Sequence, residues 1–500
     1  MHDALLIGWA EESITPDRKV SLDGQFFERI SEYVETPITA TAMAVESGSD
    51  QLVICSCDLL YIDTGLLGMV RGRVRSEDIG LDTDKIIINA THVHTAMVYE
   101  TKSDTYGSAL DVLSSFLPKD SQYTAKASSD DVLDPHEALL FLAERISAAI
   151  IQAWKARKKA YHANGFGRAP VGMCRRAVYK DGSARMWGDT DSLDFMNLEG
   201  GNDSGIELLY IFDGQKKLTG VVANIACPAQ VVEHRSFISS DYWGKVRILL
   251  REHFNSSLYV LGLCSAAGDQ CPRDLIRWVG PETPIDDPNI SRENHTERNA
   301  DTSMFDINGT WKVGKRIADE IADVYEKAVS HICDDMALVH KVMIFDLPVR
   351  TVTGSEYEIA KDQITGYISK AGRSGFDFAD NAQMHVYAGT AARYGYQKDH
   401  GYFPVEVHVV RFSDIAFATN PFELFLDYGN IIRARSRAKQ TFIIQLACGN
   451  GLYLPTEKAE AGSHYSAYVS SGITGHEGGE ILVRKTVLEI NRMWNIGGNT

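Results

Sequence analysis

Short apolar runs alternate along this chain with longer segments in which apolar residues recur every three or four positions. Runs of about four to eight apolar residues predict buried strands, and the longer periodic segments predict amphipathic helices. The clearest series is a hairpin of Ala42–Val45 and Leu52–Cys55, a helix over Leu66–Glu77 and a strand over Asp84–Asn89. Strands that alternate with helices in this way predict an α/β fold.

The same alternation continues to the end of the chain, beginning with a long helix predicted over His136–Lys158. Further strands are predicted over Glu207–Phe212, Leu218–Ala226, Ser257–Leu263, 337–352, 405–420 and 440–448, and further helices over Asp241–Phe254, Trp311–Ile332, 355–371, 422–435 and 478–493. The polar segment 100–135 is predicted to be a lid, and residues 277–306 a loop. Because no linker interrupts the pattern, we expect one large domain over residues 1–500, with mixed sheets flanked by helices.

Composition and charge narrow the class of function. The chain has 500 residues, 44% of them hydrophobic, and a formal net charge of −17, which argues against binding to the phosphate backbone of nucleic acids. No apolar stretch reaches the roughly 18 residues of a membrane span, and the N-terminus lacks the pattern of a signal peptide. The eight scattered cysteines are typical of reduced thiols. We expect a cytoplasmic protein that binds a small molecule, and leave the formation of a homo-oligomer open.

Two histidines follow the predicted strand over Asp84–Asn89. His92 and His94 are two positions apart, so on an extended backbone their side chains point the same way. Imidazoles at the carboxyl end of a strand in an α/β sheet suit a metal site, or a metal beside a general acid or base. Taken alone, the pair is equally well explained by two hydrogen-bonded histidines that bind nothing.

Several segments in order along the chain carry a resemblance. Residues 90–96 read A-T-H-V-H-T-A, 239–241 read S-S-D, 267–269 read A-G-D, 420–423 read N-P-F-E and 451–456 read G-L-Y-L-P-T. They resemble motifs of the neutral (non-lysosomal) ceramidases, A-T-H-T-H-S-G, ISSD, NAGD, P-G-E and GYLPT, and Ser13–Pro16, Pro37–Ala40 and Cys57–Leu60 resemble others. The resemblance implies a ceramidase-like α/β catalytic domain. The ceramidase C-terminal β-domain would begin where this chain ends, and we expect it to be absent.

The resemblance also implies a hydrolase site with one zinc ion per chain. By motif, His92, Glu423 and Tyr453 bind the metal and His94 lies beside the bond that is cleaved. Nitrogen and oxygen ligands with an open position suit zinc and a bound water. Zinc lowers the pKa of that water to about 7, which makes it a nucleophile at neutral pH.

One ligand of the family is missing from its expected place. The ceramidases carry another zinc histidine in the context A-V-H-G-T or A-T-H-P, where this chain has Cys227 or Pro228. Either Cys227 supplies a thiolate, or His234 reaches the metal from further along, or the site binds metal weakly or not at all. We expect His234, because it preserves the ligand type.

The remaining candidates rest on weaker signals. Asp269 follows a turn of small residues and is predicted to be catalytic, although it also fits a turn aspartate. Gln25, Arg29 and Tyr465 are predicted to bind substrate. Glu423 taken alone would be the first-turn carboxylate of a helix.

The predicted function is therefore a zinc-dependent hydrolase of a small soluble amide or a carbohydrate-derived compound, with a role in carbohydrate metabolism. Two alternatives stay open: glycoside or ester cleavage on the same scaffold, and a non-catalytic binding protein whose metal site has decayed.

Overall fold

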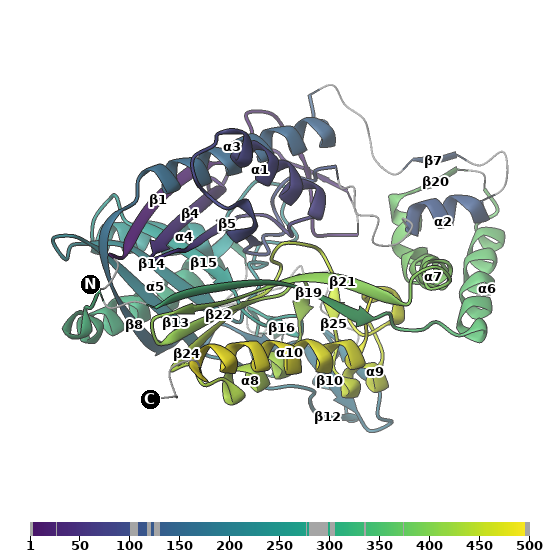
Figure 1. Ribbon diagram of the computed structural model, residues 1–500. Coiled ribbons are helices and arrows are strands. Elements are labelled where there is room, and N and C mark those ends of the chain that lie inside the picture. The colour runs from purple at the N-terminus through teal and green to yellow at the C-terminus, as the bar shows by residue number, and fades with distance from the viewer. Residues whose placement is uncertain are drawn as a thin grey trace.

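The computed structural model of this chain describes residues 4–26, 28–100, 109–117, 122–124, 131–276, 278–279, 299–300, 306–334, 337–373 and 375–495. They form two main sheets with helices on their outer faces, and a separate group of helices lies to one side (Figure 1). This mixture of sheets and helices confirms the predicted α/β class.

The larger sheet has eight strands in the order β15-β14-β13-β8-β1-β4-β5-β6. The strands are β1 (Leu6–Ser13), β4 (Thr39–Ser47), β5 (Asp50–Cys57), β6 (Ile86–Ala90), β8 (Lys158–Arg168), β13 (Gly205–Asp213), β14 (Leu218–Ile225) and β15 (Tyr259–Cys264). Neighbours are antiparallel except for two pairs near the edges, β5 with β6 and β14 with β15. Each parallel pair is joined by a helix, which gives two strand-helix-strand units in one sheet.

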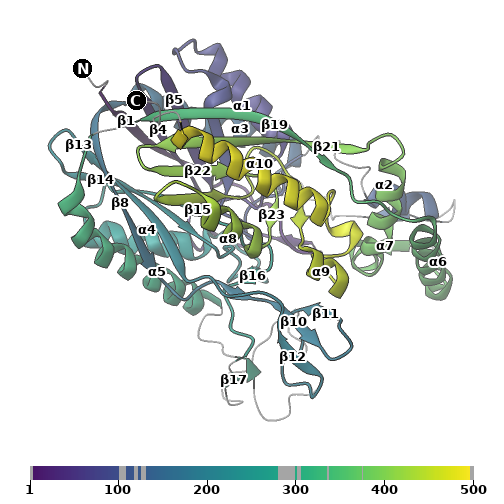
Figure 2. The ribbon, with the colours of Figure 1, turned by 60° about the horizontal axis from the view of Figure 1, so that its bottom comes forward.

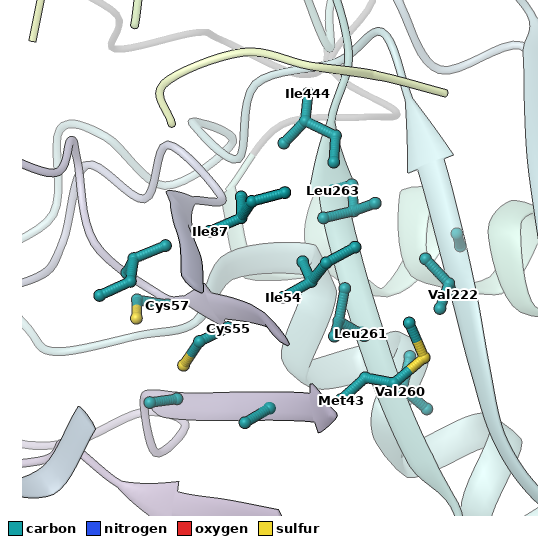
Figure 3. Packing of buried hydrophobic residues seen from close by; sticks show 14 of the residues in the cluster. Met43, Ile54, Cys55, Cys57, Ile87, Val222, Val260, Leu261, Leu263 and Ile444 are labelled. Atoms are coloured by element: carbon teal, nitrogen blue, oxygen red, sulfur yellow. The ribbon is translucent and has the colours of Figure 1, made fainter. Parts of the chain in front are cut away.

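The two edges of this sheet come together in space. The hydroxyl of Ser56 on β5 donates to the carbonyl of Gly262 on β15, with 2.5 Å between the oxygens. The buried side chains of Met43, Ile54, Ile87, Val222, Leu261, Leu263 and Ile444 pack between the two units (Figure 3). Because both units are parallel pairs, the loops at their carboxyl ends, after Ala90 and after Cys264, lie where ligands bind in α/β sheets.

The smaller sheet has four strands in the order β19-β21-β22-β24. Its strands are β19 (Leu338–Pro348), β21 (Tyr402–Phe412), β22 (Ile415–Thr419) and β24 (Gln440–Ile444). Helices α8 (Leu426–Arg435) and α10 (His476–Asn495) lie side by side over it (Figure 2). Two short strands, β23 (Glu423–Leu424) and β25 (Tyr453–Leu454), pair in parallel beside it. Glu423 thus lies in a strand before α8, so the helix predicted over 422–435 begins later than expected.

Helices cover the larger sheet. Helices α1 (Thr64–Ser76) and α3 (Pro135–Lys155) pack together on one side, and α4 (Asp241–His253) and α5 (Asp306–Ala328) pack together on another (Figure 1). Asp63 caps α1, since its carboxylate accepts from the backbone N–H groups of Gly65 and Leu66. None of the helices that the structure describes is long and apolar enough to span a membrane.

A small helical group has its own core. It contains α2 (Ala109–Phe116), α6 (Gly354–Ala371) and α7 (Phe378–Tyr396), with the parallel strands β7 (Gln122–Thr124) and β20 (Gly375–Asp377). Leu113, Ile364, Phe376, Met384 and Ala388 pack between them. The lid predicted over 100–135 falls partly outside the described residues, as does most of the loop predicted over 277–306.

Short elements complete the described chain. They are β2 (Ser21–Leu22), β3 (Arg29–Ile30), β9 (Met173–Cys174), β10 (Arg176–Tyr179), β11 (Ala184–Met186), β12 (Phe195–Leu198), β16 (Gln270–Cys271), β17 (Trp278–Val279), β18 (Asn299–Ala300), α9 (Glu457–Gly462), η1 (Thr83–Lys85), η3 (Val329–His331) and η4 (Val469–Ser471). Strands β10, β11 and β12 form a separate sheet at the periphery of the molecule (Figure 2).

Candidate functional site

His92 lies in the loop after β6 and faces a carboxylate. Its backbone adopts the left-handed conformation, with φ +66°, which is uncommon outside glycine. The Nδ1 atom donates to the carbonyl of Leu60 at 2.8 Å, and Nε2 lies 3.2 Å from Oε2 of Glu423. With the proton on Nδ1, neutral His92 and Glu423 point lone pairs at each other. A cation between them, whether a proton or a metal ion, resolves this opposition.

The two short strands bring Glu423 and Tyr453 together. The two residues are directly paired in the parallel bridge of β23 with β25. The backbone N–H of Gly268 donates to Leu424 at 2.8 Å, and a Cβ atom on Gly268 would lie 2.3 Å from the carbonyl oxygen of Glu423. The A-G-D segment therefore needs its glycine, because the backbone of β23 passes too close for any side chain.

His94 lies beside His92, with 4.7 Å between the ring centroids. Its Nδ1 atom donates to the carbonyl of Gly24 at 3.0 Å and lies 3.4 Å from Oε2 of Glu233. Its Nε2 atom is buried and has no hydrogen-bond partner among the described residues. Burial lowers the pKa of His94 well below its ordinary value, and so do the nearby guanidinium charges of Arg29 and Arg175. His94 is therefore neutral at pH 7 and holds a lone pair on Nε2.

Glycine at position 24 makes the contact with His94 possible. Gly24 has φ +96°, and a Cβ atom there would lie 2.6 Å from Nδ1 of His94. The loop therefore approaches the imidazole closely enough to fix which ring nitrogen carries the proton.

Arg175 is a buried cation behind the predicted metal ligands. Its Nη2 atom donates to the hydroxyl oxygen of Tyr453 at 3.3 Å and to the carbonyl of Gly268 at 3.0 Å. Its Nη1 atom donates to Oε1 of Gln230 at 3.4 Å. The guanidinium thus holds the side chain of Tyr453 against the segment that supports Glu423.

A cavity of about 320 Å³ joins these residues. It is lined by His92, His94, Glu423 and Tyr453, by the predicted substrate residues Gln25 and Tyr465, and by Asp23, Phe26, Tyr61, His385, Asn450, Ser470 and Ser471 among others. The rings of Phe26 and His385 stack with centroids 4.2 Å apart, and Tyr465 meets Phe26 edge-on. The cavity therefore combines an aromatic wall with polar groups, as small-molecule sites do.

In the segment where the family's other zinc histidine is missing, a different side chain lies next to the site. Buried Glu233, next to His234, lies beside His94, whereas His234 is not among the residues that line the cavity. Burial lowers the pKa of His234 to about 4. The Cys227 thiol donates to the carbonyl of Val171 at 3.3 Å, and burial raises its pKa well above the ordinary value. The ligand role of His234 therefore stays a prediction.

Two other predicted residues lie behind the cavity wall. Arg29 donates from Nη2 to the carbonyls of Asp23 at 2.5 Å and His94 at 2.7 Å, so it holds the loop under the site. Asp269 accepts from the backbone N–H of Leu426 at 2.8 Å, which places it at the start of α8. Burial raises the pKa of Asp269 to about 6. Direct contact with substrate for Arg29 and catalysis by Asp269 stay predictions, because neither side chain lines the cavity.

Sequence reasoning missed Glu233, Arg175, and the aromatic residues Phe26 and His385 of the cavity wall. Arg175 lies in no motif of the family resemblance. Local sequence does not show whether an arginine is buried or exposed. His385 belongs to α7, which the periodicity did not predict. Glu233 adjoins His234, so the motif comparison found this segment but did not single out Glu233 within it.

Two solved structures share this architecture. The crystal structure of neutral ceramidase from Pseudomonas aeruginosa aligns with 98% of this chain and 75% of its own chain, with a TM-score of 0.66 and 16% sequence identity. A ceramidase complexed with C2 aligns with 100% of this chain and 76% of its own, with a TM-score of 0.67 and 13% identity. No protein-family model and no curated protein matches the sequence. The likeness confirms the predicted ceramidase-like fold.

Proposed function

We propose that this chain is a metal-dependent hydrolase that cleaves an amide bond in a small substrate, with one zinc ion bound by His92, Glu423 and Tyr453. The observation that carries the proposal is the 3.2 Å approach of Nε2 of His92 to Oε2 of Glu423, two acceptors that need a cation between them. The fold shared with ceramidases supports hydrolysis of an amide.

The residues around the proposed metal have complementary roles. Bound zinc would polarise a carbonyl group and lower the pKa of a water molecule to about 7. Neutral His94 presents Nε2 as a base that can take a proton from water and return it to the leaving nitrogen. Tyr465 keeps its proton at neutral pH, because burial raises its pKa, so its hydroxyl can donate to the developing oxyanion.

The cavity limits the substrate. A volume of about 320 Å³ lies at the lower end of the range for small-molecule sites, roughly 300–1,000 Å³. Gln25, Asn450 and Ser470 line this space together with the aromatic rings of Phe26 and Tyr465. The substrate that fits best is a small polar amide or a carbohydrate-derived amide.

The proposal is tested by metal analysis and by hydrolysis of a panel of N-acyl, ester and glycosidic chromogenic compounds. The purified protein should carry zinc at this site and cleave the amides, and His92→Ala should abolish both. The exposed His136→Ala serves as the control. Cleavage of esters or glycosides alone would favour the alternative reactions, and a protein that binds zinc nowhere would overturn the proposal.

Metal analysis of a His234 variant tests whether this residue is a further zinc ligand. Loss of the metal in His234→Ala would support the fourth ligand expected from the family pattern. Retained metal would leave His92, Glu423 and Tyr453 as the protein ligands, which is the usual number in a catalytic zinc site.

A further inference from the structure

A second group of metal-ligating side chains lies outside the cavity of His92. Glu406 and His408 are two positions apart on β21, so their side chains share a face of the strand. Cys448 follows β24, and its backbone N–H donates to Ile88 on β6 at 2.9 Å. The carboxylate, imidazole and thiol offer ligand atoms that all lie within 4.8 Å of one another, the one such group found in the described part of the chain.

The hydrogen bonds around His408 lack one proton. Its Nε2 atom lies 2.8 Å from Oε1 of Glu406, and its Nδ1 atom lies 2.8 Å from Nε2 of His340. The Nδ1 atom of His340 lies 3.0 Å from the carbonyl of Gln51. Both ends of this row, the carboxylate and the carbonyl, only accept. Three contacts need three protons, and two neutral imidazoles supply two. The row is complete only when it contains one additional cation.

We propose that Glu406, His408 and Cys448 bind a divalent transition metal, with zinc as the first candidate. A metal on Nε2 of His408 closes the proton count, since Nδ1–H of His408 then donates to His340 and Nδ1–H of His340 donates to Gln51. Ligating histidines commonly donate their other ring N–H in this way. Nitrogen, oxygen and sulfur ligands together suit zinc and not magnesium or calcium.

The positive charge of Arg71 disfavours a metal ion beside Glu406. Its Nη1 and Nη2 atoms donate to the two oxygens of Glu406 at 2.9 and 2.7 Å. A carboxylate offers about four lone-pair sites, so this contact leaves places for a metal. Arg71 also donates to the carbonyl of Ile86 at 2.8 Å, which fixes the position of its guanidinium. Metal binding would convert the Cys448 thiol to a thiolate and release its proton to solvent. The negative charge of the thiolate would then offset the positive charge of Arg71.

A cavity gives access to this group. It measures about 350 Å³ and is lined by Arg71, Glu406 and Cys448, together with Asp63, Thr64 and Asn450. Asn450 also lines the cavity of His92, so the two sites lie on either side of one loop. The second site does not depend on the proposed hydrolase activity, because it shares no ligand with the first.

Cobalt substitution separates the two sites. Cobalt(II) bound to a thiolate shows a near-ultraviolet charge-transfer band, and the ligands proposed for the first site contain no sulfur. Adding cobalt to chelator-treated protein should produce this band. Cys448→Ser and Glu406→Gln should abolish or strongly weaken it and lower the zinc content by about one ion per chain.

The controls are His92→Ala, which removes the first site, and Cys227→Ser, which removes the other cysteine considered as a ligand. Both should keep the band. Absence of the band in the unmodified protein, or its persistence in Cys448→Ser, would overturn the proposal and leave an imidazolium as the cation. Loss of the band in Cys227→Ser alone would place the thiolate in the first site instead. Failure of the hydrolase proposal would show only in His92→Ala and in the substrate panel.

Discussion

His92 and His94 face different partners although they are two positions apart. The proton of His92 is fixed by Leu60 and that of His94 by Gly24, so both Nε2 atoms are acceptors. Only the Nε2 atom of His92 meets a carboxylate, whereas that of His94 is buried without a partner among the described residues. This difference supports the proposed roles, in which His92 binds the metal and His94 transfers protons.

This assignment predicts the behaviour of His94→Ala. Turnover should fall by about 10²–10⁴-fold, the usual effect of removing a general acid or base. The zinc content should stay unchanged, because His94 is not a ligand. Steady-state kinetics and metal analysis of the same preparation provide the measurement. Loss of zinc together with activity would instead make His94 a ligand.

The sequence motifs identified side chains that line the cavity. They did not identify the buried side chains that hold these residues in place. His92, His94, Glu423 and Tyr453 come from three distant segments, and the structure brings them together. Arg175 was missed, because its burial beside Tyr453 depends on how two remote segments pack. Such a placement has no signature in local sequence.

Helix α4 begins at Asp241, whose carboxylate links it to the segment of Glu233. One oxygen accepts from the backbone N–H of Val232 at 3.0 Å and the other from that of Tyr242 at 2.7 Å. Burial nevertheless raises the pKa of Asp241 to about 7. The native state thus binds a proton at a higher pH than the unfolded chain, where the pKa is about 3.9.

The proton on Asp241 stabilises the native state relative to the unfolded chain. This contribution to the free energy of unfolding is complete below about pH 4 and is lost as the pH rises through 7, by up to about 1.4 kcal/mol per pH unit. Asp241→Asn should remove this slope from the free energy of unfolding, measured by urea denaturation across that range. The exposed Asp319→Asn should leave the slope unchanged. Parallel profiles for Asp241→Asn and the unmodified protein would contradict the assignment.

Periodicity predicted most of the larger elements, and it failed where side-chain pattern was weak. The hairpin of β4 and β5, helices α1, α3 and α4, and strands β13 to β15 all appear where expected. Helix α7 was not predicted, because its small and polar residues form no clear apolar stripe. Glu423 lies in a strand because its backbone N–H donates to the carbonyl of Leu452 and because Gly268 donates to the carbonyl of the next residue, Leu424, each at 2.8 Å.

Across the whole molecule, one buried ion pair ties the two parallel units together. Arg247 on α4 donates through Nη1 and Nη2 to both oxygens of Asp58, at 2.7 and 3.0 Å, and both side chains are buried. Asp58 follows β5 and also accepts from the hydroxyl of Thr91, the neighbour of His92. The pair therefore connects the segment of α4 with the loop that carries the site.

Removing one partner should be costly, because it leaves the other charge buried and uncompensated. Arg247→Met should lower the free energy of unfolding by about 3–5 kcal/mol in urea denaturation. Lys315→Met, which removes an exposed pair with Asp319, is the control and should cost less than about 1 kcal/mol. Similar losses in the two variants would show that the buried pair does not hold the two units together.

The sequence by itself determined the α/β class, most helices and strands, and six side chains of the cavity, since periodicity and short motifs are local properties of the chain. Only the tertiary structure decided which strands pair, that β5 meets β15, and that Glu233 lies beside His94. It also decided that Glu406, His408 and Cys448 converge. These outcomes depend on hydrogen bonds and close packing between segments that are distant in the sequence, and a local pattern carries no information about such partners.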